Sequence, residues 1–243
     1  MTPSIENVFK NKTKNSHAHL VEEIGQDIVL GKYNPGSLIP TDNELEETYA
    51  MSRTVVREAK KTLGAKGLIT SKAKVGTMVL PKTEWNMFDQ DILRWHFAEG
   101  VQPEFISDLF DIRLIFEPSA AALAAQNATE EDKVSLRLII EEFEESTHTH
   151  AQFAAIDLKL HKAILKASGN SFLNTLAGLI EAALFGVFKR TSPNRDQKRM
   201  LLVVEEHKRI VDAICAGNAK AAEKAMTSVI ASGNENIKKL VSS

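Results

Sequence analysis

The side chains of this sequence that could do chemistry fall into two groups, and the first is a basic segment. Residues 51–77 carry seven lysines and arginines but a single acidic residue, Glu58. Within this segment, Val56, Ala59 and Leu63 recur at the spacing of one apolar helix face, so the charged residues of that helix must face solvent. A cationic helix surface of this kind can bind the phosphates and base edges of nucleic acid.

The predicted solvent face of this helix begins with Arg53, Thr54 and Arg57. An arginine fork fits both major-groove acceptors of guanine, whereas lysines farther along the helix and in the loop beyond it suit phosphates. With the neighbouring caps and loop included, the candidate DNA-binding residues are Asn43, Ser52, Arg53, Thr54, Arg57, Lys60, Lys74, Gly76 and Thr77. The alternative is that these charges only form a solvated helix surface.

The second group consists of Asp157, His161 and His207. Asp157 and His161 are four residues apart and share one helix face, which also carries the apolar residues Phe153 and Ile164. A carboxylate and an imidazole that point into a core need partners, because their desolvation is costly. A divalent transition metal such as Zn, Ni or Mn would be one such partner. The alternative is a hydrogen-bonded Asp–His pair without an ion, together with a separate core histidine.

The elements that position these groups are mostly helices. An amphipathic helix from residue 17, a helix opened by the capping-box pair Thr41 and Glu44, the basic helix and two short strands follow in the order of a winged helix-turn-helix. Helical patterns then predict an all-helical antiparallel bundle, with helices near 90–99, 103–126, 130–147, 151–168, 171–190, 195–216 and 219–241. The expected domains are a tail (1–16), a DNA-binding domain (17–80), a linker (81–89) and the helical domain (90–243).

The composition of the 243 residues fits a globular protein of two domains. Hydrophobic residues make up 43% and charged residues 26%, and the formal net charge is only -2. Cys215 is the single cysteine, so an intrachain disulfide is excluded and a reducing cytoplasm is expected. The sequence shows no apolar run of transmembrane length and no signal-type N-terminus, and we therefore expect no membrane partner.

The segment PTDNELEETYAMSRTVVREAKKTLGAKGLI, followed by KVGTMV, resembles the GntR family of bacterial regulators. The remaining chain, with DLFDIRLIFEPSAAALAA, DLKLHKAIL, SGNSFL and EHKRIVDAICAGN, resembles the FCD effector domain of its FadR subfamily. The resemblance implies a cytoplasmic bacterial transcription regulator, and more specifically a repressor, that binds a palindromic operator as a homodimer. It also implies that a small organic acid binds in the helical domain, and that the protein is not an enzyme.

The resemblance also implies which residues bind a metal ion, the effector and the operator. Metal-binding relatives use one Asp and three His, of which Asp157, His161 and His207 match three, while the spacing places Val229 at the fourth position. Arg113 is a candidate for pairing with the effector carboxylate, although a surface pair with Glu117 is its alternative. Asn170, which also stands where a helix cap is expected, and Arg190 are further effector-binding candidates. Many relatives have an operator-contacting arginine where this chain has Asn43.

The segments TEWNMFDQDILRW and AMTSVIAS resemble the branch of this subfamily that regulates galactonate operons, which implies a sugar acid such as D-galactonate as the effector. Two alternatives stay open. One is a metal-free regulator of the same family that binds an acyl ligand. The other is a metal-dependent hydrolase, since Asp157, His161 and His207 would leave an open coordination position.

Overall fold

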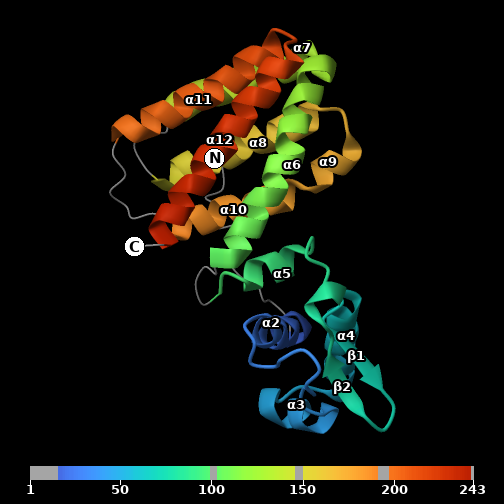
Figure 1. Cartoon of the computed structure of the whole chain (residues 1–243). Helices are drawn as coiled ribbons and strands as arrows, with labels where there is room; N and C mark the ends of the chain where they lie inside the picture. Colours follow the sequence, from blue (N-terminus) through green and yellow to red (C-terminus); the bar gives the residue numbers. More distant parts are fainter. Residues whose placement is uncertain (1–15, 99–102, 146–149, 191–196, 242–243) are drawn as a thin grey trace. The chain divides into compact units, whose positions relative to one another are not determined.

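The computed structural model describes residues 16–98, 103–145, 150–190 and 197–241, and in these ranges the side chains of 103, 150, 186–190, 197–198 and 236–241 are not described. The chain divides into two compact units, and the division falls between residues 98 and 103. The first unit combines helices with a small sheet, and the second is helical (Figure 1). The predicted fold class, a winged helix-turn-helix followed by a helical bundle, is confirmed.

The first unit holds the predicted order of elements. They are α2 (Ser16–Val29), α3 (Asp42–Tyr49), α4 (Arg53–Ala65), β1 (Ile69–Lys72) and β2 (Gly76–Val79). Thr41 and Glu44 form the predicted capping box at the start of α3. Ser52 occupies the N-cap position of α4, but its hydroxyl makes no capping hydrogen bond there. The position of this cap was therefore predicted correctly, whereas its bond was not.

The wing contains more strand structure than the sequence pattern predicts. Strands β1 and β2 pair antiparallel, with Ile69 opposite Val79 and Lys72 opposite Gly76. Leu38 also bridges to Met78 on the other edge of β2. The chain before α3 thus adds a short extended segment that pairs with the edge of the wing.

The segment predicted as a linker is ordered and packs within the first unit. It contains a 3-10 turn, η1 (Lys82–Glu84), and is followed by α5 (Gln90–Trp95). Trp85 and Trp95 both lie in the core that α2 and α4 build. The compact unit therefore extends beyond residue 89, where the sequence placed the boundary, because two tryptophans bury their rings against it.

The second unit consists of helices packed around α6 (Pro103–Asn127). Its other helices are α7 (Glu130–Glu145), α8 (His150–Ala167), α9 (Ser171–Thr175), α10 (Ala177–Arg190), α11 (Gln197–Cys215) and α12 (Ala219–Val241). Helix α6 contacts α8, α10, α11 and α12. The single helix expected over 171–190 is two helices, since Leu176 ends α9 before α10 begins. Helices α6, α8 and α11 carry the residues of the second chemical group and their partners.

Among the described residues, the structure has no helix that is both long enough and apolar enough to cross a membrane.

The packing of α5 on α2 leads to a stability prediction. A Cβ on Gly25 would lie 2.3 Å from the Trp95 ring, so Gly25→Ala should lower the free energy of unfolding of the first unit by about 1–3 kcal/mol. Trp85 and Trp95 are the only tryptophans of the chain, so their fluorescence in a urea titration reports on this unit.

The matched control is Gly64→Ala in α4, where the new Cβ would make an ordinary contact with the Ile69 carbonyl at 3.6 Å. Because alanine has a higher helix propensity than glycine, this substitution should raise the free energy of unfolding of the first unit by up to about 1 kcal/mol. Equal stabilisation by both substitutions would show that Trp95 does not pack on α2 as described.

Candidate nucleic-acid interface and candidate metal centre

Helix α4 separates apolar and basic residues as its spacing predicts. Its buried face consists of Val56, Ala59 and Leu63, each 0% exposed. Arg53, Thr54 and Arg57 are exposed at the start of the helix. Their guanidinium and hydroxyl groups are therefore free of the core, which is what contact with DNA would require.

A groove of about 390 Å³ lies between α4 and the wing. Its basic lining residues are Arg57, Lys60, Lys61 and Lys72. One of these charges is already partly neutralised, because Lys60 Nζ lies 2.6 Å from Asp42 Oδ1 on α3. A phosphate that approached Lys60 would compete with this carboxylate.

The other predicted DNA-binding residues differ in their exposure. Asn43 is exposed on the first turn of α3, and Lys74 and Gly76 are exposed in the wing with positive φ. Thr77 is only 4% exposed, and its hydroxyl lies 3.0 Å from that of Ser71 on β1. The Thr77 hydroxyl thus links the two strands of the wing, and a DNA contact at this residue stays a prediction.

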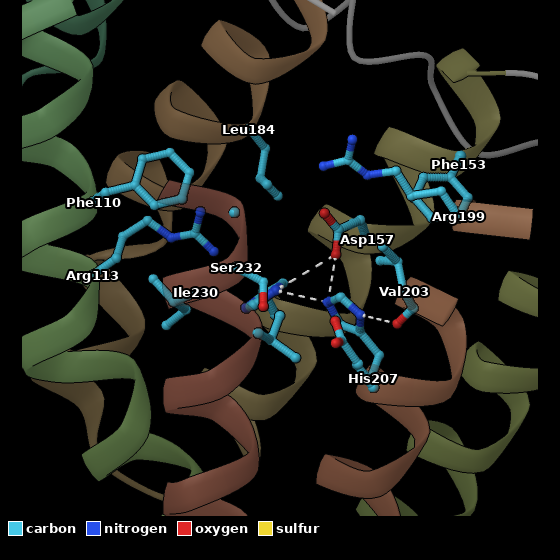
Figure 2. A pocket seen from close by; sticks show the side chains of 14 residues that line it. Phe110, Arg113, Phe153, Asp157, Leu184, Arg199, Val203, His207, Ile230 and Ser232 are labelled. Atoms are coloured by element: carbon cyan, nitrogen blue, oxygen red, sulfur yellow. Dashed lines mark hydrogen bonds and ion pairs between the residues drawn. The ribbon is translucent and has the colours of Figure 1, made fainter. Parts of the chain in front are cut away.

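Asp157, His161 and His207 come together in the second unit as the sequence predicts. Asp157 and His161 lie on α8 and His207 lies on α11, and one possible ligand atom from each falls within 4.8 Å of the others. Asp157 Oδ1 is 2.9 Å from His207 Nε2 and 3.5 Å from His161 Nε2 (Figure 2). Among the described residues these three form the group that could hold a metal ion.

Hydrogen bonds fix how both imidazoles are oriented. His207 Nδ1 lies 2.7 Å from the Val203 carbonyl, which can only accept, so Nδ1 carries the proton and Nε2 presents a lone pair. His161 Nδ1 contacts Glu117 Oε2, and its Nε2 lies 3.3 Å from His207 Nε2. Two nitrogen lone pairs at this distance repel each other unless a proton or a cation lies between them. Asp157 Oδ1 is likewise buried and faces both Nε2 atoms, so it too requires a proton or a cation at this point.

The charges of the cluster depend on one another. Burial would raise the pKa of Glu117, but Arg113 and His161 outweigh it and hold this pKa at about 2. Burial would lower the pKa of His161, but Glu117 and Asp157 raise it to about 9. Burial also opposes ionisation of Asp157, yet the two histidines hold its pKa well below the usual range. In the absence of an ion, a proton on His161 therefore supplies the positive charge that the two carboxylates require.

These observations fit a metal ion at this position. Two imidazole nitrogens and one carboxylate oxygen are a donor set for a divalent transition metal. The hydrogen bonds from each Nδ1 to a carboxylate or carbonyl are the usual outer contacts of histidine ligands. Val229, at the expected fourth position, lines the same cavity from α12 and offers no ligand atom.

A cavity of about 80 Å³ adjoins the cluster. Arg113 and Arg199 line it and lie on opposite sides of Asp157 and His207 in Figure 2. Arg113 is 2% exposed, and its Nε lies 2.5 Å from Glu117 Oε1, so this pair is buried and not the surface pair considered as an alternative. Arg199 is exposed at the first turn of α11 and was not predicted from the sequence.

Of the two remaining effector-binding candidates, Asn170 is not among the described residues that line this cavity. Asn170 is exposed and accepts hydrogen bonds from the Phe172 and Leu173 amides as the N-cap of α9. The predicted cap is therefore present, and the effector contact of Asn170 stays a prediction. Arg190 ends α10, and its side chain lies outside the described residues.

The role of Glu117 was not predicted from the sequence. Its spacing of four residues from Arg113 indicated only a possible surface pair. Its contact with His161 spans 44 residues and joins two helices, so no local pattern shows it. The available signal was a charged Arg–Glu pair within an otherwise apolar helical run, which indicates a buried pair.

Comparisons with known proteins agree with both units. Residues 17–79 match the family described as bacterial regulatory proteins, gntR family, and residues 108–232 match the FCD domain. The chain is 34% identical over 228 residues to the galactonate operon transcriptional repressor of Escherichia coli K12, which covers 94% of this chain and 99% of that protein. It is 30% identical to the transcriptional regulator LutR of Bacillus subtilis 168, over 81% of this chain and 89% of the relative.

Solved structures share the fold. A GntR protein of Streptococcus agalactiae has a TM-score of 0.52 at 23% identity, covering 90% of this chain and 99% of its own. The Listeria monocytogenes protein Lar has a TM-score of 0.65 at 16% identity, covering 94% and 99%. The relatives named here are transcription regulators and not enzymes. The chain belongs to the GntR family of bacterial transcription regulators and carries an FCD domain as its second unit.

Proposed function

We propose that this regulator is a repressor of a sugar-acid catabolic operon, and that an acid such as D-galactonate controls it. The observation that carries the proposal is a basic, solvent-facing helix and wing in a chain whose other unit holds a small cavity lined by two arginines. The 34% identity to a galactonate operon repressor over nearly the whole chain supports the choice of acid.

DNA binding is assigned to the start of α4 and to the wing. Arg53, Thr54 and Arg57 would face base edges in the major groove, with Ser52 and Asn43 beside them. Lys60, Lys74 and the backbone at Gly76 would contact phosphates. A homodimer would place two α4 helices in successive major grooves of a palindromic operator.

The acid is assigned to the cavity in the second unit. Arg113 and Arg199 line it, and a guanidinium group suits a carboxylate. The small volume and the charged lining favour a compact polar acid over the long acyl chain of the metal-free alternative. By linkage, an acid that changes operator affinity must have its own affinity changed by operator to the same extent.

A divalent metal ion is assigned to Asp157, His161 and His207. It would supply a Lewis-acid centre with positions left for oxygen atoms of water or of the acid. The protein residues orient the two imidazoles through Glu117 and the Val203 carbonyl, and they shield the centre with apolar side chains such as Val229 and Phe153. The hydrolase alternative is not proposed, because the family consists of regulators.

The DNA assignment predicts unequal effects of two arginines. Duplexes selected from a random pool by the purified protein would serve as the probe. Arg57→Gln should weaken binding to the selected duplex by about 1–3 kcal/mol, because it removes a contact at the α4 surface. Arg209→Gln, an exposed residue of α11 paired with Glu205, should leave binding unchanged. Equal binding by both variants would remove α4 from the interface.

The control by an acid predicts a change of operator affinity. D-Galactonate at saturation should change the dissociation constant of the selected duplex by about 5–150-fold, the usual range of allosteric coupling. Arg199→Gln should weaken the acid's effect without changing DNA binding in its absence. The proposal of sugar-acid control is wrong if a panel of hexonates leaves the duplex affinity unchanged.

The metal assignment predicts metal content. Protein purified without chelators should hold close to one equivalent of a transition metal by mass spectrometry of the elements, and His207→Gln should lose it. His19→Gln, on the exposed surface of α2, is the matched control and should retain it. Wild-type protein with less than about a tenth of an equivalent, even after incubation with Zn²⁺, Ni²⁺ or Mn²⁺, would favour the metal-free regulator.

A further inference from the structure

Glu117 is the most deeply buried carboxylate next to the candidate metal ligands. It lies on α6 with 1% exposure, and neither of its oxygens reaches solvent. Oε1 accepts from Arg113 Nε at 2.5 Å, and Oε2 contacts His161 Nδ1 on α8. One side chain thus joins an arginine of the cavity wall to an imidazole of the cluster.

Neutralisation of Arg113 accounts for only one of these two contacts. A carboxylate that only neutralised the guanidinium group could accept hydrogen bonds from it with both oxygens, as carboxylates often do in bidentate arginine pairs. Here the second oxygen is turned to His161, and the opposite ring nitrogen, Nε2, is thereby aimed at His207 and Asp157. His207 Nδ1 receives the corresponding support from a backbone carbonyl, so Glu117 is the only charged group among the described contacts of the two Nδ1 atoms.

We propose that Glu117 is a positioning residue for the metal centre, which holds His161 with Nε2 toward the ion and links that imidazole to Arg113 in the cavity wall. The inference rests on the proposed metal ion. Glu117 does not ligate the ion; its anionic oxygen makes His161 a stronger donor to the metal by accepting a hydrogen bond from Nδ1–H. This support matters more here because Val229 stands where a fourth protein ligand was expected.

The link to Arg113 gives the cavity a route to the metal centre. The same guanidinium group that lines the cavity holds Glu117 Oε1 through Nε. An acid bound to the other two nitrogens of the Arg113 guanidinium group would interact with the same positive charge that stabilises Glu117. Occupancy of the cavity and the strength of the support to His161 are thus coupled through one buried pair.

Metal affinity in three variants tests this role. Zn²⁺ affinity is measured by competition with a chromogenic chelator, and the Co²⁺ absorption spectrum reports the geometry of the ligands. Glu117→Gln should weaken Zn²⁺ binding about 10–100-fold and alter the Co²⁺ spectrum, because the amide is isosteric but uncharged. Glu205→Gln, an exposed carboxylate of α11 that pairs with Arg209 and lies outside the cavity lining, should bind Zn²⁺ as the wild type does.

A double variant separates positioning from charge balance. In Arg113→Met with Glu117→Gln, the buried cation is removed together with its counter-ion, which limits any loss of folding stability. The double variant should bind Zn²⁺ as weakly as Glu117→Gln alone. If it regains wild-type affinity, Glu117 only neutralises Arg113 and the proposal is overturned.

Two further outcomes are decisive. Wild-type affinity in Glu117→Gln, with an unchanged Co²⁺ spectrum, would contradict the positioning role while leaving the metal site intact. If the wild type itself binds neither Zn²⁺ nor Co²⁺, both the metal site and this inference are overturned. Far-ultraviolet circular dichroism and thermal unfolding of each variant establish that a weakened affinity is measured on folded protein.

Discussion

The second unit depends on the mutual compensation of charges buried between α6, α8 and α11. Arg113 brings one positive charge, and Glu117 and Asp157 bring two negative ones, inside an apolar core. Isolated, each would face a desolvation cost of several kcal/mol. The missing positive charge can come from a proton on His161 or from a metal ion. The three helices therefore have to pack so that these charged side chains stay within hydrogen-bonding distance of one another.

This charge balance bears on what the cavity can bind. With a proton on His161, the cluster of Arg113, Glu117, Asp157 and His161 is neutral. A divalent ion in place of that proton would leave one excess positive charge beside the cavity, to which Arg199 adds at its edge. An anion is the ligand that such a site favours. The proposed metal ion and the proposed acidic effector thus support each other electrostatically, although they were inferred from different residues.

The sequence predicted what short-range patterns determine. The inner face of α4, the capping box at Thr41 and the grouping of Asp157 with His161 all follow from helical periodicity. It did not predict the burial of Thr77 or the contact between Glu117 and His161, because both depend on segments that meet only after folding. The ordered segment after the wing was missed for the same reason, since no local pattern shows that its tryptophans enter the core of α2 and α4.

The ordered segment after the wing enlarges the part of the chain that moves together with the DNA-binding surface. Lys66 at the end of α4 pairs with Asp89 and Asp91, and Arg94 pairs with Glu22 on α2. These ion pairs are largely shielded from water and add to the burial of Trp95. Helix α5 is therefore held on the helix that precedes the DNA-binding surface and on the helix that forms it. A displacement of α5 would carry α2 and α4 with it as one body.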